Sequence, residues 1–144
     1  MKLEKLVKKQ SFSALKKILD KLFSEYIRRR GKGKCFICKC VKHWKQQQAG
    51  HYIPRRHMQF RYDEKNVNCN CVRCNVMLHG NMIAYREEMV KTYGKEWVEV
   101  MEAERHKPFK LYTSDLITQI SYYKQEIEKL NKGDVGQGPM EVKI

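Results

Sequence analysis

Two pairs of cysteines, with a histidine between them, are the residues whose types and spacing best fit metal and proton chemistry in this sequence. The pairs are Cys35–Cys38 and Cys71–Cys74, and the histidine is His51. A tight turn with C-x2-C spacing directs both sulfurs at one ion, and two such turns complete the four-sulfur site that usually holds structural zinc. The sequence therefore predicts a zinc ion bound by these four cysteines, which would add folding energy to a small domain.

Cys40 and Cys69 are two further thiols, and they leave the choice of ligands open. Either could replace a neighbour, Cys38 or Cys71, and would then form a C-x-C or C-x4-C pair. We prefer C-x2-C on both sides because its turn geometry is the commoner one. No segment resembles a signal peptide or a membrane span, so we expect the protein in the cytoplasm of the cell that makes it. Thiols stay reduced there, which favours metal binding over disulfides.

The segment between the two cysteine pairs is longer than the linker of a simple zinc finger, and it carries the other candidate residues. It contains Ala49-Gly50-His51-Tyr52-Ile53-Pro54-Arg55 and, after it, Arg61-Tyr62-Asp63-Glu64-Lys65-Asn66-Val67-Asn68. Asn75 directly follows the second pair, and Gly80-Asn81 come shortly before Tyr85. Chemistry, if the chain performs any, is expected in this inserted segment.

With these motifs the sequence resembles the NinG/Rap family of phage recombination endonucleases. The resemblance covers most of residues 11–131, because it includes both cysteine pairs, the preceding Phe-Ser-Glu-Tyr-Ile-Arg-Arg-Arg segment and the downstream helices. The central part is also similar to the wider HNH group and to the phage resolvase endonuclease VII, which sets a catalytic histidine between two C-x2-C pairs. The combination is specific, whereas any one motif alone would be a weak indication.

The resemblance implies a ββα-metal (HNH-like) core, in which a β-hairpin and a following helix hold one divalent ion, Mg²⁺ or Mn²⁺. His51 matches the general base at the end of the first strand, Asn66 the residue that braces the hairpin loop, and Asn75 the helix residue that binds the ion. These residue types suit phosphodiester hydrolysis, since a neutral imidazole can take a proton from water and a divalent ion can stabilise the charge on the phosphate and the leaving oxygen. The implied substrates are branched DNAs, Holliday junctions or D-loops.

Gly50 is the one departure from the HNH pattern, because many HNH enzymes have a metal-binding Asp or His directly before the catalytic His. NinG-like sequences share this glycine, so the departure concerns the metal ligands and not the family. Asp63 and Glu64 are the nearest acids in the sequence, and of the two we prefer Glu64 as the replacement ligand. Asn81 or His79 could also approach the ion.

The charge of the chain is concentrated at its beginning. The net charge is +14, and residues 1–60 contain 17 Lys and Arg but only 3 acids, whereas residues 61–144 contain 13 of each. Such a one-sided field favours a polyanion, which here means DNA, through phosphate contacts and counterion release. Arginines near the motifs can bind phosphates through paired hydrogen bonds. The candidate DNA-binding residues are Arg28, Arg29, Arg30, Arg55, Arg56 and Arg61.

Apolar residues at helical spacing predict the elements around this centre. Residues 1–33 form a basic arm, frayed over residues 1–10, and a helix capped by Ser11 or Ser13. Residues 34–94 are the nuclease core, ending in a helix from Met82. A helix from Lys95 to Arg105 should face inward with Trp97, Val100 and Met101.

A last helix, capped by Thr113 or Ser114, completes the C-terminal region 95–132. Its apolar residues are spaced as in a coiled-coil seam: Leu116, Ile120, Tyr123, Ile127 and Leu130. Packing onto the same chain and formation of a homodimer are equally compatible with this spacing. The Gly-rich tail 133–144 is expected to be disordered.

The predicted fold class is α+β, mostly helical, with a small zinc-stabilised ββα-metal core and flanking helices. The predicted function is that of a metal-dependent DNA endonuclease. The alternative is a zinc-ribbon protein that binds DNA without cutting it, which explains the cysteines and the charge. That alternative does not explain the joint presence of His51, Asn66 and Asn75 at nuclease spacing.

Overall fold

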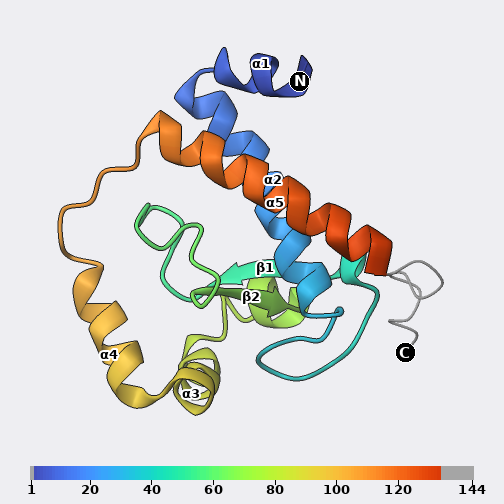
Figure 1. The fold of residues 1–144 in the computed structure, drawn as a ribbon. Helices are drawn as coiled ribbons and strands as arrows, with labels where there is room; N and C mark the ends of the chain where they lie inside the picture. Colours follow the sequence, from blue (N-terminus) through green and yellow to red (C-terminus); the bar gives the residue numbers. More distant parts are fainter. Residues whose placement is uncertain (1, 134–144) are drawn as a thin grey trace.

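A computed structural model of the chain, which describes residues 2–133, shows a two-stranded sheet surrounded by helices (Figure 1). The protein is a mostly helical α+β structure, as the sequence predicts. The elements in chain order are α1 (Lys2–Lys8), α2 (Phe12–Arg30), η1 (Trp44–Gln46), β1 (Gln48–His51), β2 (Val67–Asn70), η2 (Arg73–Met77), α3 (Met82–Tyr93), α4 (Lys95–Glu104) and α5 (Thr113–Gly133). The tail predicted to be disordered lies outside the described residues, apart from Gly133, the last residue of α5.

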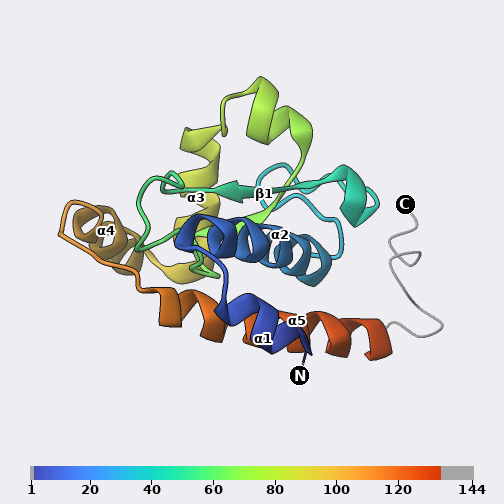
Figure 2. The ribbon, with the colours of Figure 1, turned by 90° about the horizontal axis from the view of Figure 1, so that it is seen from above.

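Helix α2 is the central element of the fold. Ser11 precedes it in an extended conformation, and its hydroxyl accepts a hydrogen bond from the Ala14 amide at 3.1 Å, so Ser11 rather than Ser13 caps the helix. At the other end the Gly31 amide donates to the Ile27 carbonyl. Seen from above, α2 lies between α5 on one side and the β-hairpin on the other (Figure 2).

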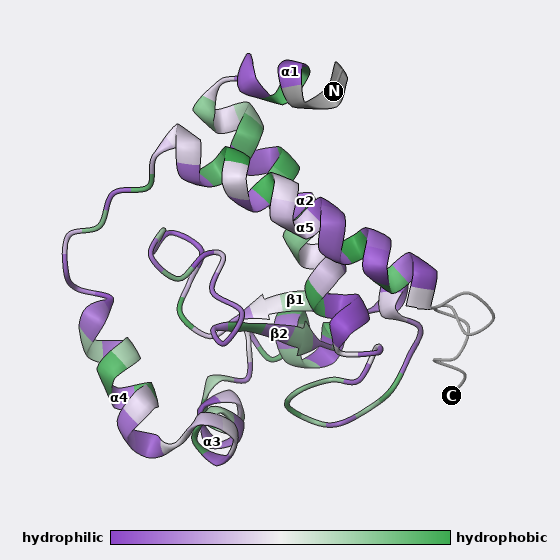
Figure 3. Ribbon diagram, viewed as in Figure 1, coloured by the Kyte–Doolittle hydropathy of each residue, from purple (hydrophilic) through white to green (hydrophobic). Residues whose placement is uncertain are grey.

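Helix α5 packs along α2 within the same chain. Leu116, Ile120 and Tyr123 of the predicted seam are buried, and hydrophobic and hydrophilic residues alternate along both helices (Figure 3). The seam was compatible with packing onto the same chain or with a homodimer, and the structure shows packing onto α2 of the same chain. Residues 1–10 were expected to form a frayed arm, but residues 2–8 form α1 and Val7 is buried in the same hydrophobic cluster. None of the helices in residues 2–133 is long and apolar enough to cross a membrane.

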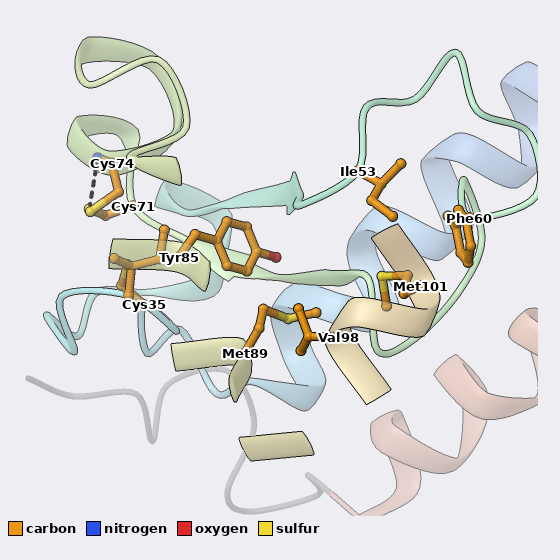
Figure 4. Close-up of a cluster of buried hydrophobic side chains, with 10 residues drawn as sticks. Cys35, Ile53, Phe60, Cys71, Cys74, Tyr85, Met89, Val98 and Met101 are labelled. Atoms are coloured by element: carbon orange, nitrogen blue, oxygen red, sulfur yellow. Dashed lines mark hydrogen bonds between the residues drawn. The ribbon is translucent and has the colours of Figure 1, made fainter. Parts of the chain in front are cut away.

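A second hydrophobic cluster joins the cysteine-rich turns to α3 and α4 (Figure 4). Tyr85 and Met89 of α3 are fully buried in it, beside Val98 of α4. The inward face of α4 differs from the predicted one, since Val98 is buried and Val100 is 59% exposed. The helix is therefore rotated so that Val98 and Met101 face the cluster.

The two strands form an antiparallel hairpin that carries His51 at the end of β1. Gln48 pairs with Asn70, Ala49 with Cys69, Gly50 with Asn68 and His51 with Val67. The connection, residues 52–66, leaves the sheet and returns to it. Because η2 follows β2 almost directly, the hairpin and this π-helical turn are neighbours, and irregular turns of this kind often occur at functional sites.

Candidate metal centre and candidate active site

Four cysteines from two distant turns meet at one point. The sulfurs of Cys35, Cys38, Cys71 and Cys74 all lie within 4.8 Å of one another, and Cys38 Sγ lies 3.6 Å from Cys71 Sγ. Zinc bound to four sulfurs at about 2.3 Å requires sulfur–sulfur separations of about 3.8 Å. The donor set and its spacing therefore fit a metal such as zinc, and this part of the sequence-based prediction is confirmed.

The choice between the six thiols follows from the same geometry. Cys40 and Cys69 are free cysteines outside the group of four, so both C-x2-C pairs are used. Burial alone would raise the pKa of the Cys38 thiol, but hydrogen bonds from the backbone of Cys40 and from neighbouring thiols outweigh it and lower the pKa to about 6. A thiol that ionises this readily is suited to bind a metal at neutral pH.

An open pocket of about 600 Å³ lies between α2 and the hairpin, and it contains the candidate catalytic residues. His51 and Asn75 line it together, although they are far apart in sequence. The other lining residues are Ser24, Arg28, Gln47, Gln48, Ala49, Pro54 and Arg55. The pocket is therefore polar and open, and two arginines line it.

The orientation of the His51 ring is set by the loop that follows β1. Its Nε2 lies 2.9 Å from the backbone carbonyl of Arg61. A carbonyl only accepts, so Nε2 carries the proton of the neutral ring and Nδ1 holds the lone pair. Among the described residues Nδ1 has no hydrogen-bond partner, which leaves it available to accept a proton.

The protonation of His51 provides a first test of the pocket. Burial lowers its pKa from 6.5 to about 4, and the positive charges of Arg55 and Arg61 act in the same direction. We expect the ring to stay largely neutral at about pH 5.5, as followed by its carbon and nitrogen NMR shifts in zinc-loaded protein. Because the folded pKa is the lower one, the stability from neutral His51 is present above pH 6.5 and falls as the pH drops towards 4. Half-protonation near pH 6.5 would contradict the buried environment described here.

Asn75 lies on η2 with one end of its amide held and the other free. Its Nδ2 donates to Gln48 Oε1 at 2.6 Å, which directs Oδ1 away from Gln48 and towards Gly50. An amide oxygen is a donor that Mg²⁺ and similar ions accept. Asn75 therefore fits the role of an ion ligand, and Gln48, which was not predicted, orients it.

Asn66 is fully buried at the base of the loop between the strands. Its Oδ1 accepts from the Ile53 amide at 2.7 Å, and its Nδ2 donates to the carbonyls of Ile53 and Phe60, each at 3.0 Å. These are contacts by which one side chain would brace the loop, and they keep Asn66 away from the pocket. Its role is to position the segment on which His51 depends.

The two acids considered as replacement ligands are not brought to the pocket. Glu64 faces α2 and α5, where its carboxylate oxygens accept from Arg30 and Tyr123, each at 3.0 Å. Asp63 accepts from the Lys65 amide at 2.8 Å within a turn. Neither acid is therefore placed to replace the side chain that Gly50 lacks.

His79 and Asn81, the other two candidates, belong to the turn after the second cysteine pair. The side chain of Asn81 donates to the sulfur of Cys74 at 3.7 Å, and His79 is exposed. Both residues have positive φ values, 51° and 49°, so this turn is tightly bent. Asn81 thus supports the four-cysteine site, and neither residue lines the pocket that contains His51.

The six arginines predicted to bind DNA separate into two groups. Arg28 and Arg55 line the pocket, and Arg61 lines an adjoining cavity that also reaches His51. Arg28 stacks on the ring of Trp44, 5.0 Å from its centre. Arg56 is exposed on the same loop. Arg28, Arg55 and Arg56 remain candidates for phosphate contacts, whereas the Arg61 side chain is 12% exposed and is held by Asp20.

Arg29 and Arg30 are instead used inside the fold. Arg29 is 9% exposed and donates to Asn131 of α5 at 2.7 Å. Arg30 donates to the side chain and backbone of Glu64 and to the Val67 carbonyl. They hold α2 to α5 and to the hairpin, so DNA contacts are not expected from them.

Asp20, which sequence reasoning missed, organises the basic side of the pocket. Its carboxylate accepts from Arg61 at 2.6 and 2.9 Å, from Arg55 at 2.9 Å and from the Tyr62 hydroxyl at 2.8 Å. Burial raises the pKa of this carboxyl, but these hydrogen bonds and charges outweigh burial and lower it. The signal was present in the sequence, because Asp20 is one of only three acids in the first 60 residues.

Replacing Asp20 by asparagine should destabilise the protein by about 2 kcal/mol, because it leaves the largely buried Arg61 without its charged partner. Urea unfolding of both proteins measures the difference. Glu99→Gln is the matched control, since it removes an acid whose pair with Lys95 is exposed, and it should change stability by less than about 0.5 kcal/mol. Equal effects of the two substitutions would show that Asp20 is not a structural anchor.

The described residues define a class of protein: small, mostly helical, with a two-stranded sheet and a four-cysteine site able to bind a metal. The family model described as "Bacteriophage Lambda NinG protein" matches residues 1–134. The chain therefore belongs to the NinG family, which confirms this part of the resemblance seen in the sequence.

Individual relatives are similar over the central part of the chain. Protein ninG of Escherichia phage lambda is 35% identical over 63 residues, which are 43% of this chain and 31% of that protein. Protein ninG of Salmonella phage P22 is 31% identical over 86 residues, 59% of this chain and 42% of that protein. The chain thus spans less than half the length of these curated relatives. No solved structure matches it significantly.

Proposed function

We propose that this protein is a metal-dependent DNA endonuclease of the HNH-like, ββα-metal kind, acting on branched intermediates of phage recombination such as Holliday junctions and D-loops. The observation that carries the proposal is the pocket in which His51, with a free Nδ1, faces the same space as Asn75 and two arginines. The antiparallel hairpin followed by the turn that carries Asn75 supports the proposal, with the five-residue π-helical η2 standing where the resemblance implied a helix.

Each residue of the pocket has a separate role in the proposed hydrolysis. Arg28 and Arg55 bind the phosphate, and His51 Nδ1 takes the proton from the water that attacks phosphorus. A new P–O bond forms as the bond to the leaving 3′ oxygen breaks, and this oxygen takes a proton from solvent. The Asn75 amide oxygen would hold the divalent ion, which supplies charge stabilisation to the phosphate and the leaving oxygen when bound.

The basic first part of the chain supports DNA as the substrate. The excess of 14 positive charges lies in residues 1–60, which include α2 and the loop that carries Arg55. Phosphate contacts position a protein on DNA without reading its base sequence. An enzyme that recognises branched DNA by its shape needs such sequence-independent contacts. Branch preference would then come from the placement of duplex arms around the pocket.

Cleavage of labelled DNA tests the proposal directly. A four-way junction and a linear duplex of matched sequence are incubated with zinc-loaded protein, with and without Mg²⁺ or Mn²⁺. We expect cutting of the junction that depends on the added ion. Equal cutting of both substrates would retain the nuclease and remove the branch preference, whereas tight binding without cutting under any metal would favour the zinc-ribbon DNA-binding alternative.

A further inference from the structure

Three amide side chains converge on the hairpin at Gly50. A Cβ atom built on Gly50 would lie 2.1 Å from Asn70 Nδ2 and 2.9 Å from Asn75 Oδ1. The first distance is far shorter than any real contact, so the Asn70 amide occupies the space that a side chain at Gly50 would need. Gln48, the partner of Asn70 across the sheet, completes the group by accepting the hydrogen bond from Asn75.

Asn70 is the member of this group without a structural explanation. It is fully buried, yet neither atom of its amide has a hydrogen-bond partner among the described residues. It lies close enough to the Tyr85 hydroxyl to offset part of the rise in pKa that burial causes there, but outside hydrogen-bond geometry. That hydroxyl donates instead to the Gly50 carbonyl at 2.7 Å. A buried amide without partners is costly, and such groups in proteins often serve a ligand.

We infer that Asn70 is a ligand of the divalent ion, supplying from β2 the oxygen that Gly50 cannot supply from β1. The inference rests on the proposed function. Because neither end of the Asn70 amide is held, a half-turn of the amide presents Oδ1 in place of Nδ2 without breaking a hydrogen bond. The Oδ1 of Asn75, directed towards the same point, supplies the second protein oxygen.

Asn75 lines the pocket, whereas Asn70 is buried on the other side of the Gly50 position, and the donor types of the two side chains suit a divalent ion between them. Mg²⁺ and Mn²⁺ prefer oxygen donors, and Mg²⁺ usually keeps several waters and takes few protein ligands beside the phosphates of its substrate. The acids nearest in sequence, Asp63 and Glu64, are engaged elsewhere. Two neutral amides therefore hold the ion weakly until a DNA phosphate adds its charge.

Mn²⁺ binding to the zinc-loaded protein without DNA tests the inference, with free Mn²⁺ measured by electron paramagnetic resonance. Asn70→Leu should weaken binding by about tenfold or more, since removing even an indirect partner of a metal ligand has effects of this size. Asn70→Asp should tighten binding, because a carboxylate adds negative charge to the site. Glu64→Gln is the control and should leave Mn²⁺ affinity unchanged. Asn70→Leu should keep its zinc and melt no lower than wild type, because it replaces an unpaired buried amide by an apolar group of similar size.

Moving the ligand to the other strand provides a second test. The double variant Gly50→Asp, Asn70→Gly clears the space at Gly50 and places a carboxylate there, so Mn²⁺ affinity should return at least to the wild-type value. Equal Mn²⁺ affinity of wild type and Asn70→Leu would overturn the inference, and if both cut DNA the proposed function would stand. A wild-type protein that binds no Mn²⁺ would also overturn the inference, and one that in addition does not cut DNA would defeat the proposed function as well.

Discussion

Alanine in place of His51 should lower the single-turnover rate of junction cleavage by roughly 10²–10⁴-fold, the usual contribution of a general base. The His51 ring is the one group of the pocket with a free nitrogen lone pair. Its Nε2–H donates to the backbone carbonyl of Arg61, and this leaves the lone pair of Nδ1 without a partner. Its pKa of about 4 keeps it neutral at the pH of the assay, so the base form is already populated. Cleavage is measured with enzyme in excess of a labelled four-way junction, so that product release does not limit the rate.

Two controls separate loss of the base from loss of the fold. The variant must bind the uncut junction and retain its zinc, and His106→Ala, which removes an exposed histidine beyond α4, should cut at the wild-type rate. Free imidazole should restore part of the activity to His51→Ala, since the truncation leaves room where the ring was. Cleavage within tenfold of wild type would show that His51 is not the base.

The features predicted correctly are those that local sequence determines. The C-x2-C turns place two sulfurs together by their own geometry, and they identify the metal-binding group of four. The Ser11 cap and the apolar period of α2 are equally local. The hairpin was implied by the family resemblance and not by local sequence, and the π-helical turn after it was not predicted.

The features that were missed depend on distant partners. Glu64 looked available for a metal, but its partners Arg30 and Tyr123 come from helices 34 and 59 residues away. Asp20 meets Arg61 across 41 residues. Such pairs are decided by how α2 and α5 pack, which periodicity alone does not give.

Arg28, Arg29 and Arg30 show a case in which simple geometry would have improved the prediction. Consecutive residues of a helix point about 100° apart, so three adjacent arginines cannot all face one pocket. Only Arg28 lines it, while Arg29 turns to α5 and Arg30 to the hairpin. Similarly, α4 offered two nearly equal apolar faces, and contact with Met89 and Tyr85 selected the one with Val98.

Removal of the metal from the four cysteines should unfold the half of the protein that contains α3 and α4 and should abolish cleavage. Cys35, Cys71 and Cys74 belong to the same hydrophobic cluster as Tyr85 and Met89. Without a metal, that cluster depends on a few apolar contacts and on thiols that repel one another once ionised. Structural zinc contributes on the order of 10 kcal/mol in small domains, which exceeds the whole stability of many proteins of this size.

Cysteine-to-serine variants give the sharpest form of this prediction. Cys71→Ser should purify with less than one equivalent of zinc and lose hydrogen-exchange protection in residues 82–104, whereas α2 and α5, which pack on each other in a separate cluster, should retain theirs. Cys40→Ser is the matched control, because its sulfur lies beside the site but outside the group of four, and it should keep one zinc per chain. Loss of zinc from both variants would place Cys40 among the ligands, and unchanged protection in Cys71→Ser would mean that the hydrophobic cluster holds α3 and α4 without the metal.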